Sequence, residues 1–388
     1  MRLIFASLRK RMTPRRLLFV INDAAFFVSH RLCLAVEAQR AGYEVHVATN
    51  AGTAATRIRA TGLVHHILPL SRSGSHPIAE LRALVAIGRL YLTLRPDLVH
   101  LVTIKPVIYG GILARLLRVP RIVAAIPGFG FVFLSKGFGA RLRRRLVVAL
   151  YRTALRHPRI AIIFQNPQDC EDMLRSVGLD ASRAFLVSGS GVDMALFGQP
   201  RRDTAIPRVV MASRLLRDKG VHEFIEAATR IRARGVPVTF SLAGATDPGN
   251  PATVADADVT RWEQSGVVEI LGHTLDIPAL FQTADIVVLP SYREGLPKVL
   301  IEAAAASAAV ITTDVPGCRD AIVPEVTGLL VPAGDADALT QAIESLVTDR
   351  PRSCAMGVAG RALAAERFAQ DRIIAQQLTI YETLFASA

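Results

Sequence analysis

Two carboxylates, Glu294 and Glu302, stand eight positions apart in the stretch SYREGLPKVLIEA. Pro297 suits the first turn of a helix, so the spacing predicts Glu294 in a turn and Glu302 between one and two turns inside the helix. An ionised carboxylate only accepts hydrogen bonds. At this separation one carboxylate can meet sugar hydroxyls while the other accepts both hydrogen bonds of a ribose diol. The alternative is a pair of surface glutamates that bind Arg293 and Lys298.

Two cations, Arg214 and Lys219, lie in the stretch ASRLLRDKG, between a predicted strand and a helix that begins near Val221. Two fixed cations beside a helix amino terminus form an anion site, most naturally for a diphosphate. The alternative is that both are solvated loop charges.

These residues converge on one edge of a predicted sheet. Five positions follow directly after predicted strand ends: Arg214, Gly244, Gly272, Glu294 and Gly317. Ligands of parallel α/β sheets bind outside the carboxyl ends of the strands. The second half of the chain is therefore predicted to hold a ligand site.

Short apolar runs alternate with segments of helical period along the whole chain. The first half has LLFVI, EVHVAT, DLVHLV, RIVAAI, RIAIIF and AFLVSG, and the second half has RVVMAS, VTFSLAG, VVEILG, IVVLPS, AVITTD and GLLVP. Residues 29–41, between the first two runs, have the spacing of a helix. Strands that alternate with helices indicate a parallel sheet covered on both faces. The predicted class is α/β, with two Rossmann-like parallel-sheet domains.

The 388 residues suit two domains of roughly 150 to 200 residues each. We expect a basic amino-terminal arm at 1–16, a first domain at 17–197, a second at 198–365 and a carboxyl-terminal helix at 366–388. The boundary is placed in QPRRDTAIP, which is rich in proline and charge.

The net charge of +13 comes from the first half of the chain. Residues 1–195 hold 28 Lys/Arg against 10 Asp/Glu, whereas residues 196–388 hold 18 against 23. A basic lobe should seek the phosphates of nucleic acid, anionic lipid or an anionic substrate. We expect no nucleic-acid partner, because the first half lacks interleaved aromatics and any zinc-finger or RNA-binding signature.

The four cysteines, Cys33, Cys170, Cys318 and Cys354, are scattered, with no CxxC pair. This favours a reducing compartment, and we expect all four to be small buried side chains. No apolar run reaches the 18 or so residues that span a membrane. The basic amino terminus has no secretory signal pattern, so residues 1–15 are interpreted as an arm or as a start assigned too far upstream.

The motifs together resemble a known family. SYREGLPKVLIEA, preceded by ASRLLRDKG and GSGVD and followed by TTDVPGCRDAI, is similar to the retaining glycosyltransferases of family 4. These enzymes have the GT-B fold, with two Rossmann-like domains facing a central cleft. The resemblance covers nearly all of the chain from about Leu17 onward. One departure is AAAASAAVI after Glu302, where the family usually has a small-residue run that ends in Gly-x-Pro.

The resemblance implies a role for each site residue. Arg214 and Lys219 would hold the diphosphate of a nucleotide sugar, Glu294 would contact the donor sugar, and Glu302 would bind the ribose. Arg214, Lys219 and Glu294 are thus the catalytic candidates. The remaining donor-side candidates are Gly295, Leu296, Lys298, Gly272 and His273.

The resemblance also implies that no metal or other cofactor is needed, and no DxD motif follows a strand in a suitable place. It further implies that the carboxyl-terminal helix packs back on the first domain.

Acceptor-side candidates follow strands of the first half. Asp23 and His30 lie in INDAAFFVSHR, and His30 could equally cap a helix that starts at Ser29. His100 and Lys105 lie in DLVHLVTIKPVIYGG, which resembles a subgroup that extends lipid-linked glycans, with Lys105 as a polar group at the cleft. For His100 we favour the alternative of a buried histidine at a strand end.

A membrane contact is predicted in IPGFGFVFLSKGFGARLRRRL. Its residues are Phe131, Phe133, Lys136, Arg141, Arg143, Arg144 and Arg145. A basic cluster beside apolar groups suits an anionic bilayer, at about 1 kcal/mol per basic residue near the membrane. The alternative is core phenylalanines and a solvated helix face. We expect the segment to dock on the inner face of a bacterial cytoplasmic membrane, where a polyprenyl-diphosphate-linked acceptor would lie.

The predicted reaction moves a hexose or N-acetylhexosamine from a nucleotide diphosphate sugar, UDP by analogy, to a polyprenyl-diphosphate-linked saccharide in polysaccharide or glycan biosynthesis. A UDP-sugar 2-epimerase is the alternative within the same fold. A nicotinamide-dependent oxidoreductase would need G-x-G-x-x-G and an acidic partner, which GFGF lacks. A non-catalytic membrane-binding protein would not need both cations and both glutamates.

Overall fold

The computed structural model describes residues 14–70, 76–128, 138–199, 205–274 and 276–386. The predicted membrane residues Phe131, Phe133 and Lys136 lie outside these ranges, as do the first thirteen residues of the arm.

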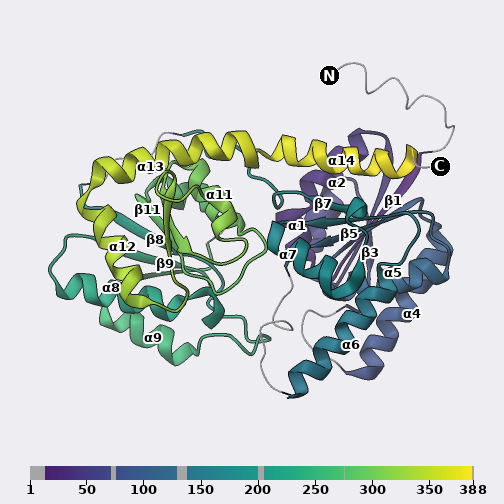
Figure 1. The fold of residues 1–388 in the computed structure, drawn as a ribbon, viewed down its shortest axis with the longest axis horizontal. Coiled ribbons are helices and arrows are strands. Elements are labelled where there is room, and N and C mark those ends of the chain that lie inside the picture. The colour runs from purple at the N-terminus through teal and green to yellow at the C-terminus, as the bar shows by residue number, and fades with distance from the viewer. Residues whose placement is uncertain (1–13, 71–75, 129–137, 200–204, 275, 387–388) are drawn as a thin grey trace. The chain divides into compact units, whose positions relative to one another are not determined.

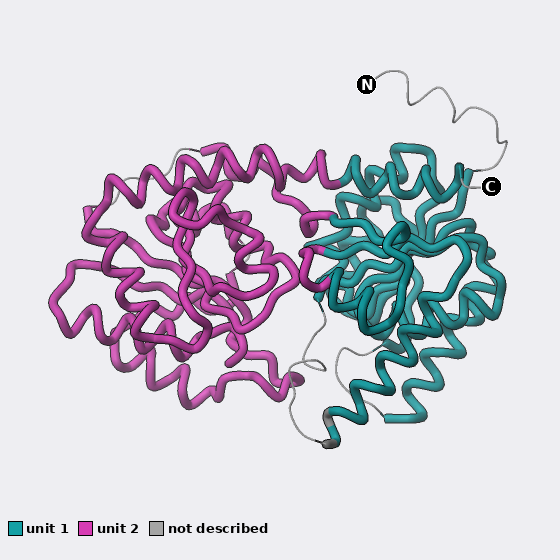
Figure 2. The backbone as a smooth tube through the Cα atoms, in the orientation of Figure 1, with its two compact units in different colours: residues 1–164, 170–186, 374–388 teal, residues 165–169, 187–373 magenta. Residues whose placement is uncertain are grey.

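The chain forms two compact units (Figure 2). Unit 1 comprises residues 1–164, 170–186 and 374–388, and unit 2 comprises residues 165–169 and 187–373. The long segment of unit 2 begins after residue 186, where the sequence predicts a boundary at 197. The chain returns to unit 1 at residue 374, where the sequence predicts 366.

Unit 1 contains a parallel sheet of seven strands in the order β3-β2-β1-β4-β5-β6-β7. The strands are β1 Arg15–Ile21, β2 Tyr43–Thr49, β3 Val64–Ile67, β4 Leu98–Val102, β5 Ile122–Ile126, β6 Ile160–Phe164 and β7 Ala184–Leu186. The sequence predicts six of them and misses β3. That strand, VHHI, is a short edge strand with two histidines and no fully buried side chain, so it lacks the apolar run by which the others are found.

The helices of unit 1 differ from prediction near the amino terminus. Asp23 caps α1 by accepting a hydrogen bond from the Phe26 N–H at 2.8 Å, so the helix begins at Ala24 and not at Ser29. The described helices are α1 Ala24–His30, α2 Leu32–Arg40, α3 Ala54–Ala60, α4 Pro77–Leu94, α5 Ile104–Leu116 and α6 Phe138–Ala154. Helix α7 Pro167–Met173 follows β6 and begins in unit 2, with its residues from 170 onward in unit 1. Helix α5 packs against both α4 and α6 (Figure 1).

Unit 2 contains a parallel sheet of six strands in the order β10-β9-β8-β11-β12-β13. They are β8 Arg208–Ala212, β9 Thr239–Ala243, β10 Glu269–Gly272, β11 Ile286–Leu289, β12 Ala309–Thr313 and β13 Gly328–Val331. All six are predicted by the sequence. Together with unit 1 they confirm the fold class, an α/β chain with two Rossmann-like parallel sheets.

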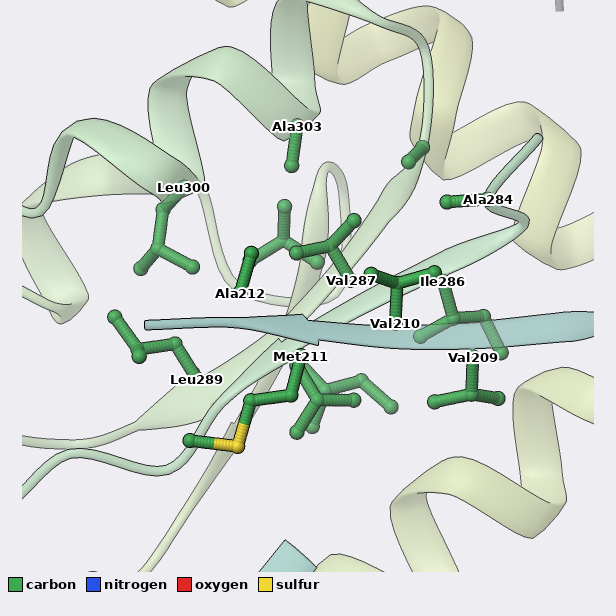
Figure 3. Close-up of a cluster of buried hydrophobic side chains, with 14 of the residues drawn as sticks. Val209, Val210, Met211, Ala212, Ala284, Ile286, Val287, Leu289, Leu300 and Ala303 are labelled. Carbon is green, nitrogen blue, oxygen red and sulfur yellow. The ribbon is translucent and has the colours of Figure 1, made fainter. Parts of the chain in front are cut away.

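The second sheet is buried on both faces. Figure 3 shows Val209 and Met211 on one side of β8 and Val210 and Ala212 on the other, as the alternation of a strand requires, and all four are buried. The covering helices are α8 Val221–Ala233, α9 Asp256–Ser265, α10 Ile277–Gln282, α11 Lys298–Ala305, α12 Ala336–Thr348 and α13 Arg350–Leu363. This double cover explains the continuous apolar strand runs of the sequence.

The last helix, α14 Gln370–Ala386, brings the chain end back to unit 1. The Tyr381 side chain is fully buried, and its hydroxyl lies 2.5 Å from Nδ1 of His100 on β4. Arg121 donates a hydrogen bond from Nε to the Leu384 carbonyl at 2.8 Å. Glu382 pairs with Arg15 at 3.2 Å. Contacts from β1, β4 and the residue before β5 therefore hold residues 381–384.

The expectation that all four cysteines are buried is wrong for two of them. Cys318 is buried and Cys170 is half-buried, but Cys33 and Cys354 are exposed. On α2 the buried residues are Leu34, Ala35 and Ala38, which leaves Cys33 off the buried face.

No helix among the described residues combines the length and apolarity needed to cross a bilayer.

The burial of His100 predicts a pH-dependent stability. Burial disfavours the imidazolium and holds the pKa of His100 well below its usual value, with repulsion from Arg31 in the same direction. Below about pH 6.5 the unfolded chain binds a proton that the folded chain does not, so the free energy of unfolding falls as the pH falls. For one histidine the slope is at most about 1.4 kcal/mol per pH unit. Urea denaturation followed by circular dichroism between pH 5.5 and 7.5 should show it.

His100→Gln is the comparison, because it keeps an acceptor for Tyr381 and removes the titrating group. Its slope over that range should be smaller than that of the wild type. The remaining slope has a source in His65, His66 and His157, whose pKa values burial also lowers. Equal slopes in wild type and variant would show that His100 is not the group involved.

Candidate functional site

The site candidates of unit 2 lie where the strand order reverses. Strands β8 and β11 are hydrogen-bonded neighbours, and the chain continues from β8 to β9 on the other side. The loops after β8 and β11 therefore leave the sheet side by side at a topological switch point, the usual ligand position in such sheets. Lys219 comes from the first loop and Glu294 from the second.

Lys219 and Glu294 form an ion pair at this point. Their side chains are only 16% and 15% exposed. The Ser291 hydroxyl donates a second hydrogen bond to the same Glu294 oxygen, Oε1, at 2.8 Å. Ser291 is not among the predicted site residues, although its position three residues before Glu294 at a strand end is a usable signal.

Arg214 lies at the same strand edge but is more open to solvent. Its Nη1 lies 2.7 Å from Oδ2 of Asp247 in the loop after β9, and its side chain is 43% exposed. Such a pair contributes at most about 1 kcal/mol. An anionic ligand can therefore replace Asp247 as the partner of Arg214 at little cost.

Main-chain contacts fix the spacing of the two loops. The Tyr292 N–H donates to the Asp218 carbonyl at 2.9 Å, and the Tyr292 hydroxyl donates to Glu223 at 2.6 Å. This hydrogen bond and partial burial raise the pKa of Tyr292 to about 12. Gly220 has φ +74°, and a Cβ there would lie 2.2 Å from the Pro290 carbonyl oxygen. Only glycine allows the loop of Lys219 to approach the end of β11 so closely.

The loop after β12 supports the Glu294 turn from a third side. The Glu294 N–H donates to the Pro316 carbonyl at 3.3 Å. Gly317 has φ +83°, and a Cβ on it would lie 2.4 Å from the Glu294 carbonyl oxygen. Next to it, burial raises the pKa of the Cys318 thiol to about 12, with the charge of Glu294 as a further cause. Cys318 is thus a neutral packing residue beside the site.

Glu302 lies just over one turn into α11, as the spacing predicts. It pairs with Lys298 at 2.9 Å, and burial raises its pKa while Lys298 opposes that rise. In the turn before this helix, the N–H groups of Gly295 and Leu296 have no acceptor among the described residues. Two unpaired amides, a cation and a carboxylate thus lie along one helix start.

The alternative that the glutamates pair with Arg293 and Lys298 is half right. Glu302 does pair with Lys298. Glu294 pairs with Lys219, whereas Arg293 pairs with Asp169.

The remaining donor-side candidates lie on the neighbouring edge of the sheet. The Gly272 carbonyl accepts a hydrogen bond from the Gly244 N–H at 2.7 Å, which joins the ends of β10 and β9. His273 follows and is exposed. The structure therefore places Gly272 on the sheet edge and His273 in solvent, with no contact to the charged group described above.

In unit 1, Asp23 and Lys105 lie in the loop after β1 and at the start of α5, again at a switch point, because β1 and β4 are neighbours. Lys105 pairs with Glu80 at 2.6 Å. Between them the Thr103 hydroxyl donates to Asn22 at 3.0 Å. Thr103 has φ +76°, which a β-branched residue rarely adopts. The sequence gives no sign of this strained position.

The two histidines of unit 1 are placed differently. His30 is the last residue of α1, so it does not cap a helix that starts at Ser29. Its ring stacks on the Phe26 ring, with the two ring centroids 4.2 Å apart. His100 is fully buried in the middle of β4 against Tyr381. His100 as an acceptor-side residue is therefore wrong, because no surface of it is available to a ligand. The buried alternative is correct, although the residue lies within the strand and not at its end.

Comparison with known proteins is decisive for the family. Residues 206–349 match the family described as glycosyl transferases group 1, and residues 16–166 match the family described as glycosyl transferase 4-like. The chain belongs to the family-4 glycosyltransferases. It is therefore a glycosyltransferase, and its two parallel-sheet domains are those of the GT-B fold.

Three relatives illustrate the match. The chain is 29% identical over 305 residues to N,N'-diacetylbacillosaminyl-diphospho-undecaprenol alpha-1,3-N-acetylgalactosaminyltransferase of Campylobacter jejuni, over 76% of this chain and 79% of the relative. It is 31% identical to the capsular polysaccharide biosynthesis glycosyltransferase CapM of Staphylococcus aureus, over 44% of each. The crystal structure of Anabaena HepE in complex with UDP matches with a TM-score of 0.76 and 19% identity, over 96% of this chain and 100% of the other.

These matches decide between the alternatives of the sequence analysis. The 2-epimerase is not favoured, because the matching families and the named relatives are glycosyltransferases. The departure from the family pattern after Glu302 has a local consequence in the structure. Ser307 there has φ +61°, a conformation that glycine adopts more easily.

The close approach at Gly317 predicts a large effect of one methyl group. Gly317→Ala forces the Glu294 turn to move, and a misplacement of about 1 Å can cost about 100-fold in rate. We expect kcat to fall on that scale while the folded state loses only about 1 to 3 kcal/mol. Sugar transfer assays and thermal denaturation of the same preparation measure the two effects.

Gly235→Ala is the matched control. Gly235 has φ +73°, but a Cβ on it would have no neighbour within 4 Å. The control carries the same backbone strain and should keep near-normal kcat. Equal activities of the two variants would show that the contact of Gly317 with Glu294 does not matter for the site.

Proposed function

We propose that this glycosyltransferase is a retaining enzyme that moves a hexose or N-acetylhexosamine from a nucleotide diphosphate sugar to a polyprenyl-diphosphate-linked saccharide. The observation that supports it most is the arrangement of Arg214, Lys219, Glu294 and Glu302 at the carboxyl edge of the second sheet. Two cations and two carboxylates at a switch point match a ligand that carries both phosphates and hydroxyls.

The charges suit the bond that breaks. When the anomeric carbon–oxygen bond of the donor opens, its electron pair leaves with the diphosphate. Lys219 and Arg214 stabilise that negative charge, and the amides of Gly295 and Leu296 lie at the same helix start. In this proposal Lys219 exchanges Glu294 for a phosphate oxygen, and Glu294 turns to the sugar hydroxyls. The reaction needs no metal in this scheme, because the two cations supply the compensating charge.

Glu302 is assigned to the ribose. Its burial beside Lys298 puts a carboxylate in a place where an unsatisfied charge would be costly. A ribose diol would supply two donors to it. UDP is the proposed nucleotide, supported by the UDP in the related HepE crystal structure.

The acceptor is assigned from the relatives. The Campylobacter jejuni enzyme is named for a diphospho-undecaprenol-linked sugar, and CapM for capsular polysaccharide. The same chemistry is proposed here, in surface polysaccharide or glycan biosynthesis on the inner face of a bacterial cytoplasmic membrane. In unit 1 the switch-point residues Asp23 and Lys105 are the proposed acceptor contacts.

The activity test is direct. The protein is incubated with UDP-hexoses and UDP-N-acetylhexosamines, each with and without an undecaprenyl-diphosphate-linked saccharide, and the lipid fraction is analysed by mass spectrometry. The proposal expects mass addition to the lipid only when both substrates are present, with the anomeric configuration of the donor kept. Sugar conversion without acceptor, or an inverted product, would contradict it.

Removal of either cation should abolish most of the activity. Lys219→Ala and Arg214→Ala each lose a donor to the developing charge, which typically costs about 100- to 1000-fold in kcat. Arg217→Ala is the matched control, since Arg217 is an exposed arginine of the same turn and should keep near-normal turnover. The measurement is the steady-state kcat of each variant with the nucleotide sugar that the wild type uses best. Near-normal rates in both site variants would remove the phosphate assignment.

The membrane partner is supported by a basic stretch of the chain and by the exposed side chains of α6 and α4. Residues 98–168 hold twelve Lys/Arg and no Asp/Glu. The four arginines of α6, at positions 141, 143, 144 and 145, are exposed, and so are Leu142 and Leu146 between and beside them. On α4, which packs with α6 against α5, a stripe of large apolar side chains is also exposed: Ile78, Leu81, Val85 and Leu92. Exposed apolar groups among exposed positive charges match an anionic bilayer surface.

Replacing the four α6 arginines by serine should weaken vesicle binding. At about 1 kcal/mol per basic residue the loss approaches 1000-fold on vesicles rich in phosphatidylglycerol, and rising salt should reduce binding of the wild type. Co-sedimentation measures both. The control variant carries four serines for exposed arginines of unit 2, at positions 217, 232, 234 and 261. Binding that persists without the α6 arginines would place the membrane contact elsewhere.

A further inference from the structure

The segment Gln165–Asp169 directly follows β6 in the chain, yet its contacts place it in unit 2. It contributes two buried polar side chains, Asn166 and Asp169, which are 0% and 1% exposed. Buried polar groups are costly unless each is paired. Both find their partners in the turn that carries Glu294.

Asn166 holds the turn on one side of Glu294. Its Nδ2 donates to the Gly295 carbonyl at 2.7 Å and to Oδ2 of Asp169 at 3.1 Å. Its Oδ1 accepts the Asp169 N–H at 2.8 Å. The oxygen and the nitrogen of the Asn166 amide are thus both paired, and three hydrogen bonds to two residues fix its orientation.

Asp169 holds the turn on the other side. Its Oδ1 forms an ion pair with Arg293, whose side chain is 19% exposed. The residues immediately before and after Glu294 are thus fixed by one short segment. The Glu294 side chain itself contacts Ser291 and Lys219, and neither Asn166 nor Asp169.

We propose that Asn166 and Asp169 are positioning residues, which hold the turn of residues 293–295 so that the Glu294 carboxylate lies in reach of the donor sugar. This rests on the proposed function of Glu294. A buried ion pair adds little stability compared with apolar packing, but its hydrogen bonds define one geometry. Asn166 and Asp169 hold the residues on either side of Glu294, so the Glu294 side chain can exchange Lys219 for a ligand while the turn stays in place.

A double-mutant cycle separates positioning from general stabilisation. Asn166→Ala should lower kcat about 10- to 100-fold with the donor KM within about threefold, because the carboxylate is displaced and not removed. In a Glu294→Gln background the same change should lower kcat by no more than about twofold, since its effect passes through the carboxylate. UDP affinity by calorimetry should stay within about threefold in Asn166→Ala.

Asp285→Asn provides the matched control. Asp285 is also a buried carboxylate of unit 2, but it precedes β11, whereas Glu294 follows that strand. It accepts a hydrogen bond from the Arg208 N–H at 2.8 Å and lies 3.7 Å from Arg350. The Asp285→Asn variant should have a lower melting temperature but an unchanged kcat. Should Asn166→Ala fail to fold, Arg293→Lys replaces it in the cycle, because lysine keeps the charge and loses the planar fork.

Two results would overturn the proposal. One is a full 10- to 100-fold loss from Asn166→Ala in the Glu294→Gln background, since the two changes would then act independently. The other is a kcat loss in Asp285→Asn equal to that in Asn166→Ala at equal loss of stability. Failure of the proposed function looks different, because the wild-type protein would then transfer no sugar from any nucleotide sugar.

Discussion

The ion pair between Lys219 and Glu294 joins the two loops that leave β8 and β11 at the switch point of the second sheet. Opposite charges from neighbouring strands are held there at low exposure, with Ser291 as a second partner of the carboxylate. In this state the two groups satisfy each other. The proposed donor, a nucleotide diphosphate sugar, carries phosphate oxygens as partners for Lys219 and hydroxyls as partners for Glu294.

The rest of unit 2 fixes the positions of the two loops that carry Lys219 and Glu294. The strands beneath it are buried on both faces, which gives the loops fixed starting points (Figure 3). Gly220 and Gly317 let backbone pass close to Pro290 and Glu294, where any side chain would collide. Tyr292 ties the second loop to the first through Asp218 and Glu223. The contacts of Gly220, Gly317 and the Tyr292 N–H are made by main-chain atoms, so they do not depend on the partner that the charged groups take.

Much of this arrangement could be predicted from the sequence, because the signals are local. Apolar runs bounded by turn residues identify twelve of the thirteen strands, and the spacing of Glu294 and Glu302 gives their places before and within α11. The sequence favours burial of His100 but does not show what covers it. Only the return of α14 brings Tyr381 against it.

Long-range pairing was hidden for the same reason. Asn166 and Asp169 lie more than a hundred positions before Arg293 and Gly295, and nothing in QNPQD indicates that the segment belongs with the second sheet. Asp247 is a similar case, an ordinary loop acid until the fold places it beside Arg214. Exposure of Cys33 follows from which face of α2 meets the sheet, and a single residue cannot reveal that.

The most direct measurement is calorimetric comparison of UDP with uridine as ligands of the wild-type protein at fixed salt. Recognition of a diphosphate by Arg214 and Lys219 predicts that UDP binds roughly 100-fold more tightly or better, since each charge-assisted hydrogen bond contributes about 1.5 to 3 kcal/mol. The difference should shrink as salt rises. Equal affinity for the two ligands, or no binding of UDP at millimolar concentration, would contradict a diphosphate site at this edge of the sheet.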